Sequence, residues 1–249
     1  MLNLYKKELQ YYLNNPIGYI IIGLFAVFAN FLFIKDIFVI GSASMRPFFT
    51  VIPWLLLIFI PALTMRIISE ERRANTVEVL LTLPISETQV VLSKFFALCT
   101  LMVISLVLTM GIPISLFFLT KLYFPEIFAG YFGSLLLAAG FIGISMLFSS
   151  LTKNQVVAFL TSIITLFILL VLGTDFMGGI LPRMILDFLT YFTPQYHFQN
   201  FVKGVFDKER LLFLIFYCRR FLLYDMMPLS VRHIHFLRQQ KKFLRMLTM

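Results

Sequence analysis

Residues 65–94 read MRIISEERRANTVEVLLTLPISETQVVLSK, and this stretch decides how the rest of the chain is arranged. It carries eight charged side chains, whereas the segments on both sides of it are long and apolar. Charged side chains are costly inside a lipid bilayer, so the stretch must lie in water between two membrane-spanning segments. It is therefore the place where a soluble partner could bind.

The same stretch has the pattern of two helices separated by a break. Polar and apolar residues recur along it at helical spacing, the polar ones at Glu71, Asn75, Glu78 and Thr82 and the apolar ones at Ala74, Val77 and Leu81. Pro84 cannot continue that helix, and Ser86 with Gln89 forms the S-x-x-Q pattern of a capping box. We therefore expect a short amphipathic helix, a break at Pro84 and a second helix that enters the membrane; the alternative is a solvated loop.

The composition is that of an integral membrane protein. Of the 249 residues, 60% are hydrophobic and 13% are charged, whereas a soluble domain has about 45–50% apolar and about 25% charged residues. The net charge of +9 does not indicate nucleic-acid binding, because the basic residues cluster beside apolar segments, as orientation in a membrane requires. Cys99 and Cys218 lie in apolar runs, which favours small hydrophobic side chains over a disulfide.

Six apolar segments predict an all-α, polytopic fold with one transmembrane domain over residues 1–229, followed by a basic C-terminal tail at 230–249. The expected spans lie near residues 17–34, 48–65, 95–120, 127–152, 156–173 and 211–229. The last is interrupted by Arg219 and Arg220, each of which costs about 2.5–3.5 kcal/mol at a helix centre. Either the sixth span is short, or residues 211–249 lie on the membrane surface.

The N-terminal residues 1–15 predict a helix that lies along the membrane surface. One side of this helix is apolar, with Leu4, Leu9, Tyr12 and Leu13, while Lys6, Lys7, Glu8 and Asn14 are expected to stay in water. Tyrosines such as Tyr5, Tyr11 and Tyr12 suit the depth of the lipid headgroups.

Glycines mark two features of the expected spans. Gly133, Gly140 and Gly143 lie in the fourth span, where small residues allow helix backbones to approach closely. Gly111 and Pro113 predict a local bend in the third span.

The distribution of basic residues favours one orientation. With residues 66–94 in the cytoplasm, 14 of the 21 Lys and Arg residues lie on the cytoplasmic side, as the positive-inside rule requires. Seven of these 14 belong to residues 219–249, so that the two sides are equal without that tail. The predicted orientation therefore rests also on the expectation that residues 66–94 bind a soluble partner in the cytoplasm.

Three segments resemble the permease subunit of an ABC-2 type transporter, in particular the gliding-motility-associated and copper-processing permeases. They are KKELQYYLNNPIGYI at 6–20, ISEERRANTVEVLLTLPIS at 68–86 and PQYHFQNFVKGVFD at 194–207. The second contains the pattern E-x-R-x-x-x-T-x-E-x-L-L-x-x-P, filled by Glu70, Arg72, Thr76, Glu78, Leu80, Leu81 and Pro84. The resemblance extends from residue 1 to about residue 207.

The resemblance implies six membrane helices, an N-terminal interfacial helix and a cytosolic coupling helix between the second and third spans. That helix would bind a separate ABC ATP-binding subunit through Glu70, Glu71, Arg72, Thr76, Glu78, Leu80, Leu81 and Pro84. The resemblance also implies a second permease, either a copy of this chain or a paralogue, and export across the cytoplasmic (inner) membrane of a bacterium. ATP and Mg would be bound by the partner, because this chain has no GxxxxGK[ST] phosphate-binding motif.

Two other functions compete with an ABC permease. An ATP-independent secondary transporter would place ionisable residues inside its spans, and the first five expected spans contain none. An intramembrane metalloprotease would need metal-binding histidines at membrane depth, and the first histidine of the chain is His197. We therefore expect no catalytic site, metal site or directly bound cofactor in this chain.

The C-terminal part departs from the ABC-2 pattern, which implies a continuous apolar last span and a short basic end. After Asp207 the sequence instead contains Arg219, Arg220 and Asp225 within the expected span. We hypothesise that a reading-frame shift altered residues from about 210 onward. Resequencing of the locus and translation of both frames would test this hypothesis.

Overall fold

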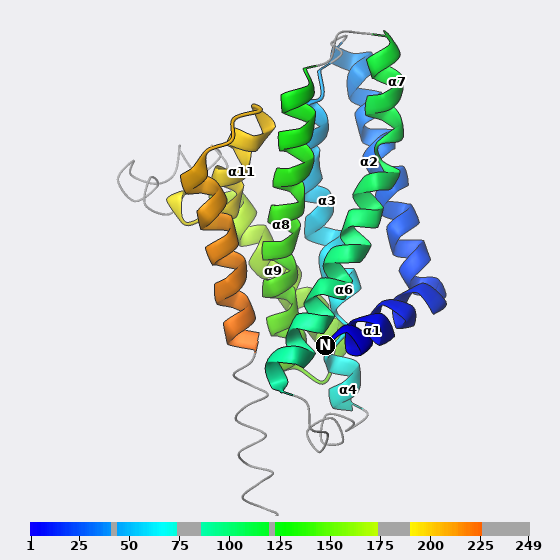
Figure 1. Ribbon diagram of the computed structural model, residues 1–249, viewed down its shortest axis with the longest axis vertical. Helices are drawn as coiled ribbons and strands as arrows, with labels where there is room; N and C mark the ends of the chain where they lie inside the picture. The colour runs from blue at the N-terminus through cyan, green and yellow to red at the C-terminus, as the bar shows by residue number, and fades with distance from the viewer. Residues whose placement is uncertain (41–43, 74–85, 120–122, 174–189, 226–249) are drawn as a thin grey trace, which may run out of the picture.

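The computed structural model describes residues 1–40, 44–73, 86–119, 123–173 and 190–225, and these residues contain helices and no strand. Five helical segments are long and apolar enough to cross a membrane, namely Pro16–Lys35, Arg46–Arg73, Thr88–Phe118, Phe124–Leu151 and Gln155–Leu172. They lie along the long axis of the molecule, and successive segments run in opposite directions (Figure 1). The expected all-α, polytopic membrane fold is confirmed.

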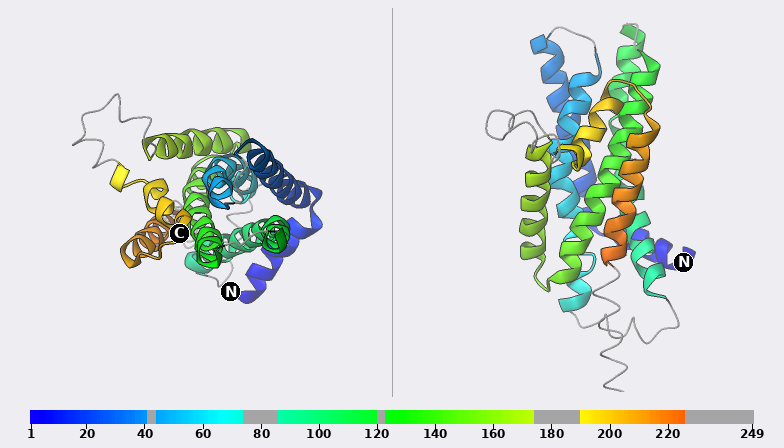
Figure 2. Two further views of the ribbon diagram at one scale, coloured as in Figure 1. Left: turned by 90° about the horizontal axis from the view of Figure 1, so that it is seen from above. Right: turned by 90° about the vertical axis from the view of Figure 1, so that its left-hand side faces the viewer.

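Helix α8 (Phe124–Leu151) is the centre of the bundle. It packs against α3 (Arg46–Thr64), α6 (Glu87–Leu108), α9 (Gln155–Leu172) and α11 (Pro194–Val202), which surround it when the molecule is seen from above (Figure 2). Its buried face is rich in glycine, alanine and serine, and such small residues allow neighbouring helices to approach closely. In the most apolar 18-residue stretch of each helix, 67% of the residues of α8 but only 22% of those of α9 are buried. Helix α8 therefore forms the core, and α9 presents most of its surface outward.

Helix α1 (Leu2–Asn14) lies across one end of the bundle, next to α4 (Ser69–Arg73) (Figure 1). The chain turns sharply after α1, and α2 (Pro16–Ile40) then runs along the bundle. Helix α1 packs against α2 and against the start of α6. The predicted N-terminal helix is present, and it covers the polar end of the bundle.

The third span has a break, as Gly111 and Pro113 predict. Helix α6 ends at Leu108, and α7 (Gly111–Leu119) begins after a turn. In this turn the hydroxyl of Thr109 donates to the carbonyl oxygen of Leu106 at 2.7 Å and lies 3.1 Å from the hydroxyl of Tyr131. These contacts satisfy polar groups that the break exposes inside the bundle.

Residues 208–225 form a further helix beside α8. This helix is not among the five segments that could cross a membrane by length and hydropathy. Six charged residues interrupt its apolar pattern: Lys208, Glu209, Arg210, Arg219, Arg220 and Asp225. The sixth span and the reading-frame hypothesis therefore stay predictions. Residues 226–249, which include the whole basic tail at 230–249, lie outside the described residues.

Candidate transmission site

Three of the eight residues expected to bind the ATP-binding subunit, Glu70, Glu71 and Arg72, lie in α4. The other five lie outside the described residues: Thr76, Glu78, Leu80, Leu81 and Pro84. Helix α4 has acidic residues in its first turn and basic residues in its last turn, which stabilises a helix through its dipole. At the far side of the gap, α6 begins at Glu87 with Ser86 as its N-cap, but the side-chain hydrogen bond of the expected capping box is not formed there.

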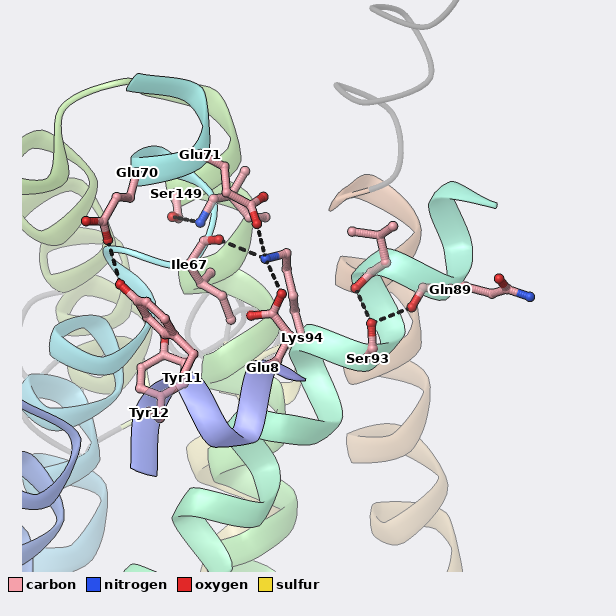
Figure 3. A network of polar contacts seen from close by, with 12 residues as sticks. Glu8, Tyr11, Tyr12, Ile67, Glu70, Glu71, Gln89, Ser93, Lys94 and Ser149 are labelled. Carbon is pink, nitrogen blue, oxygen red and sulfur yellow. Dashed lines mark hydrogen bonds and ion pairs between the residues drawn. The ribbon is translucent and has the colours of Figure 1, made fainter. Parts of the chain in front are cut away.

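The side chain of Lys94 joins three elements at this end of the bundle (Figure 3). Its ammonium group donates to Glu8 Oε1 of α1 at 2.9 Å and to Glu71 Oε1 of α4 at 2.7 Å. It also donates to the backbone carbonyl oxygen of Ile67 at 3.2 Å. The Lys94 side chain is 3% exposed, that of Glu8 13% and that of Glu71 28%. A buried ammonium group requires such partners, because taking it out of water unpaired is strongly unfavourable.

The expectation that Glu8 stays in water is wrong. Glu8 lies one helical turn before Tyr12, on the face of α1 that packs against the bundle. Tyr12 is 5% exposed, and its hydroxyl donates to the carbonyl oxygen of Leu63 at 2.9 Å. The helix therefore presents a mixed polar and aromatic face to the protein, and the charge of Glu8 alone gave a misleading indication of its environment.

A second contact joins α1 to α4. The hydroxyl of Tyr11 donates to Glu70 Oε2 at 3.0 Å (Figure 3). Burial raises the pKa of the Tyr11 phenol above its ordinary value, and the hydrogen bond to the Glu70 carboxylate raises it further. The phenol therefore keeps its proton, and with it this hydrogen bond, throughout the neutral pH range.

Helix α4 is also attached to the end of the central helix α8. The hydroxyl oxygen of Ser149 accepts hydrogen bonds from the backbone N–H groups of Ile68 and Ser69, both at 3.3 Å. The guanidinium group of Arg72 donates to the backbone carbonyl oxygen of Ser150. All three described residues of the set expected to bind the ATP-binding subunit, Glu70, Glu71 and Arg72, thus make contacts within the permease. The neighbouring Arg73 is exposed.

The expectation that the first five spans contain no ionisable residue is wrong for the helices as the structure has them. The third span begins at Thr88 and so includes Lys94, and the fourth begins at Phe124 and so includes Glu126. Glu126 is 8% exposed and pairs with Arg46 at 3.4 Å. Both charges lie near the starts of their helices, where the expected span began seven residues too late in the third segment and three residues too late in the fourth.

Within the described ranges, no group of three His, Cys, Asp or Glu residues is placed to hold a metal ion. The thiols of Cys99 and Cys218 are both free, so these residues form no disulfide with each other, as expected.

Burial raises the pKa of the Tyr12 phenol, as it does for Tyr11. Both phenol groups of α1 therefore stay protonated and uncharged at neutral pH.

The three glycines expected to pack helices all face the C-terminal part of the chain. A Cβ atom on Gly133 would lie 2.6 Å from Cβ of Phe201 in α11. On Gly143 it would lie 3.1 Å from Cβ of Phe221, whereas on Gly140 it would come no closer than 3.4 Å to a neighbouring ring. The approach is therefore tight at Gly133 and an ordinary contact at Gly140.

We expect Gly133→Ala to lower the melting temperature of the purified protein more than Gly140→Ala does. Phe201 is fully buried, so α11 must shift to admit the extra methyl group, and such overpacking usually costs about 1–3 kcal/mol. Thermal unfolding in detergent measures the difference. Gly140→Ala is the matched control, since it adds the same methyl group to the same helix, and equal melting temperatures would contradict the tight contact.

Comparison with known proteins adds to this geometry. A family model described as ABC-2 family transporter protein matches residues 1–210 of the chain, which includes all five candidate spans, α4 and α11. A search of curated proteins finds no match. The matched region ends three residues into the helix at 208–225. The chain therefore belongs to the ABC-2 transporter family and is a multi-pass membrane permease of that type.

Proposed function

We propose that this permease couples ATP hydrolysis by a separate ATP-binding subunit to the export of a substrate across the cytoplasmic membrane of a bacterium. Family membership supports the partnership with an ATP-binding subunit. On this proposal residues 70–84 receive the force from the partner, and the membrane helices follow as rigid bodies. A second permease, either a copy of this chain or a paralogue, completes the transporter, and ATP and Mg are bound by the partner.

The observation that carries this proposal is the attachment of α4 to three other elements. Arg72 and Ser149 connect α4 and its approach to α8, Lys94 connects it to α6, and Tyr11 connects it to α1. A displacement of residues 74–85, which directly follow α4, would therefore reach the central helix of the bundle. A segment connected to the bundle only by a loose loop would absorb such a displacement instead.

The same end of the bundle is the cytoplasmic end in this proposal. It carries α1, α4 and the short connection between α8 and α9 (Figure 1). Basic residues belong to all three of these regions, as the positive-inside rule requires of cytoplasmic segments: Lys6, Lys7, Arg72, Arg73 and Lys153.

We expect Glu78→Lys and Thr76→Pro to uncouple ATP hydrolysis from transport without preventing membrane insertion. A reversed charge disrupts a polar contact with the partner, and proline prevents a helix from continuing through its position. The measurement is affinity purification of the permease in detergent, identification of the P-loop ATPase that accompanies it, and the ATPase rate of the complex. The variants should keep a monodisperse elution profile but lose the effect of the permease on that rate.

Glu209→Lys is the matched control, because Glu209 is an exposed glutamate that lies outside residues 70–84. Wild-type coupling in Glu78→Lys and Thr76→Pro would show that residues 70–84 do not transmit force from the ATP-binding subunit. A permease that purifies without any P-loop protein, and transports its substrate without ATP, would favour an ATP-independent secondary transporter instead.

A further inference from the structure

Lys94 uses all three of its N–H donors at one place. The acceptors are Glu8 Oε1, Glu71 Oε1 and the carbonyl oxygen of Ile67, at 2.9, 2.7 and 3.2 Å (Figure 3). A lysine ammonium group has three donors and no acceptor, so its hydrogen-bonding capacity is complete here. All three bonds have a charged donor, and the two to Glu8 and Glu71 also have a charged acceptor, which makes these two the shorter and stronger ones.

These contacts join segments that are remote in the sequence. Glu8 precedes Lys94 by 86 residues and Glu71 precedes it by 23 residues. Two more hydrogen bonds connect α1 to the same stretch, from the hydroxyl of Tyr11 to Glu70 and from the hydroxyl of Tyr12 to the carbonyl oxygen of Leu63. Helix α1 is therefore attached to residues 63–71 both directly and through Lys94.

The arrangement at Lys94 differs from an ordinary surface ion pair. Surface pairs are solvated by water and screened by salt, and they are worth about 0–1 kcal/mol, so they separate easily. Lys94 is almost fully buried and the side chain of Glu8 is 13% exposed, so separating them would leave charges poorly solvated inside the protein. A buried cluster of this kind resists separation, and the elements that carry it tend to move together.

We propose that Lys94 is a positioning residue that makes α1, α4 and the first turns of α6 move as one body. This inference rests on the proposed function, in which residues 70–84 receive the force of ATP hydrolysis. The N-terminal helix then takes part in the transmission and is more than an anchor in the lipid surface. Helix α1 lies across the end of the bundle beside α4 (Figure 1), so on this proposal a movement of α4 is passed on to α1.

Spin labels on α1 and α4 test this proposal directly. Gln10 in α1 and Arg73 in α4 are both exposed and suit Gln10→Cys and Arg73→Cys in a background with Cys99→Ala and Cys218→Ala. The distance between the labels is measured first in the permease alone and then in the complex with its copurified ATPase, nucleotide-free and trapped with ATP and vanadate. We expect one narrow distance distribution that is the same in all three samples.

The Lys94→Met variant should broaden that distribution and abolish the effect of the permease on the ATPase rate, and Lys94→Arg should restore both. If Lys94→Met folds poorly, the triple variant Glu8→Gln, Glu71→Gln, Lys94→Met removes all three charges together and should show the same broadening. Lys6→Met is the matched control, because Lys6 is an exposed lysine of α1, and this variant should behave as wild type.

Two results would overturn the proposal. One is a wild-type distance that changes between the nucleotide-free and trapped samples, which would show α1 and α4 moving apart. The other is an unchanged narrow distribution in the permease alone when Lys94 is methionine. Neither result depends on failure of the proposed function, which would appear instead as a permease that purifies without a P-loop ATPase.

Discussion

Replacing Lys94 by methionine is expected to destabilise the folded permease by about 3 kcal/mol, the lower end of the range for breaking a buried ion pair. The variant keeps the side-chain length but removes the cation that Glu8 and Glu71 share, and it leaves the Glu8 carboxylate largely buried without that charge. Glu71 is 28% exposed, so water will compensate part of the loss at that carboxylate, whereas Glu8 at 13% has less access to water. Unfolding by sodium dodecyl sulfate in mixed micelles measures the change.

The triple variant Glu8→Gln, Glu71→Gln, Lys94→Met separates two explanations of that loss. If the instability comes from uncompensated carboxylates, neutral glutamines remove its cause, and the triple variant should recover more than half of the lost stability. If the instability comes from lost packing of the lysine side chain, the triple variant should be as unstable as Lys94→Met. The second outcome would contradict the electrostatic account of the cluster.

The membrane fold follows from local properties of the sequence. Long apolar runs must be helical in lipid, because no water is present there to satisfy the backbone. The first five predicted spans correspond to Pro16–Lys35, Arg46–Arg73, Thr88–Phe118, Phe124–Leu151 and Gln155–Leu172. The largest differences are at the end of the second segment, where Arg66 was used as a boundary, and at the start of the third, where Lys94 was used as a boundary. A lysine can lie within a helix that spans the membrane when buried carboxylates near the helix end compensate its charge.

The candidate site was only partly predictable. Glu70, Glu71 and Arg72 stand out through their charge in the quoted stretch, and the structure places them at one end of the bundle. The role of Lys94 did not stand out, because its partners lie 86 and 23 residues away and hydrogen bonding over such separations leaves no local pattern. A better signal was the i, i+4 relation of Glu8 and Tyr12, which puts a carboxylate on the aromatic face of α1.

A second large effect is expected from Gly18→Ala, at the sharp turn between α1 and α2. A Cβ atom on Gly18 would lie 2.3 Å from the backbone carbonyl oxygen of Tyr12 and 3.1 Å from its carbonyl carbon. The obstacle is the backbone of α1, so no change of side-chain conformation can relieve it, and α1 must move away from α2. Because α1 carries Glu8, this movement should weaken the contact with Lys94 and lengthen the distance between spin labels at Gln10 and Arg73.

Gly23→Ala is the matched control for this change. Gly23 lies five residues further along the same helix, and a Cβ atom placed on it meets nothing within 4 Å. Alanine also favours a helix interior over glycine by about 1 kcal/mol, so Gly23→Ala should leave the label distance unchanged and stabilise the protein slightly. If the label distance in Gly18→Ala equals that in Gly23→Ala, the turn between α1 and α2 can open without moving α1. The position of α1 is then set by its contacts with residues 63–71 alone.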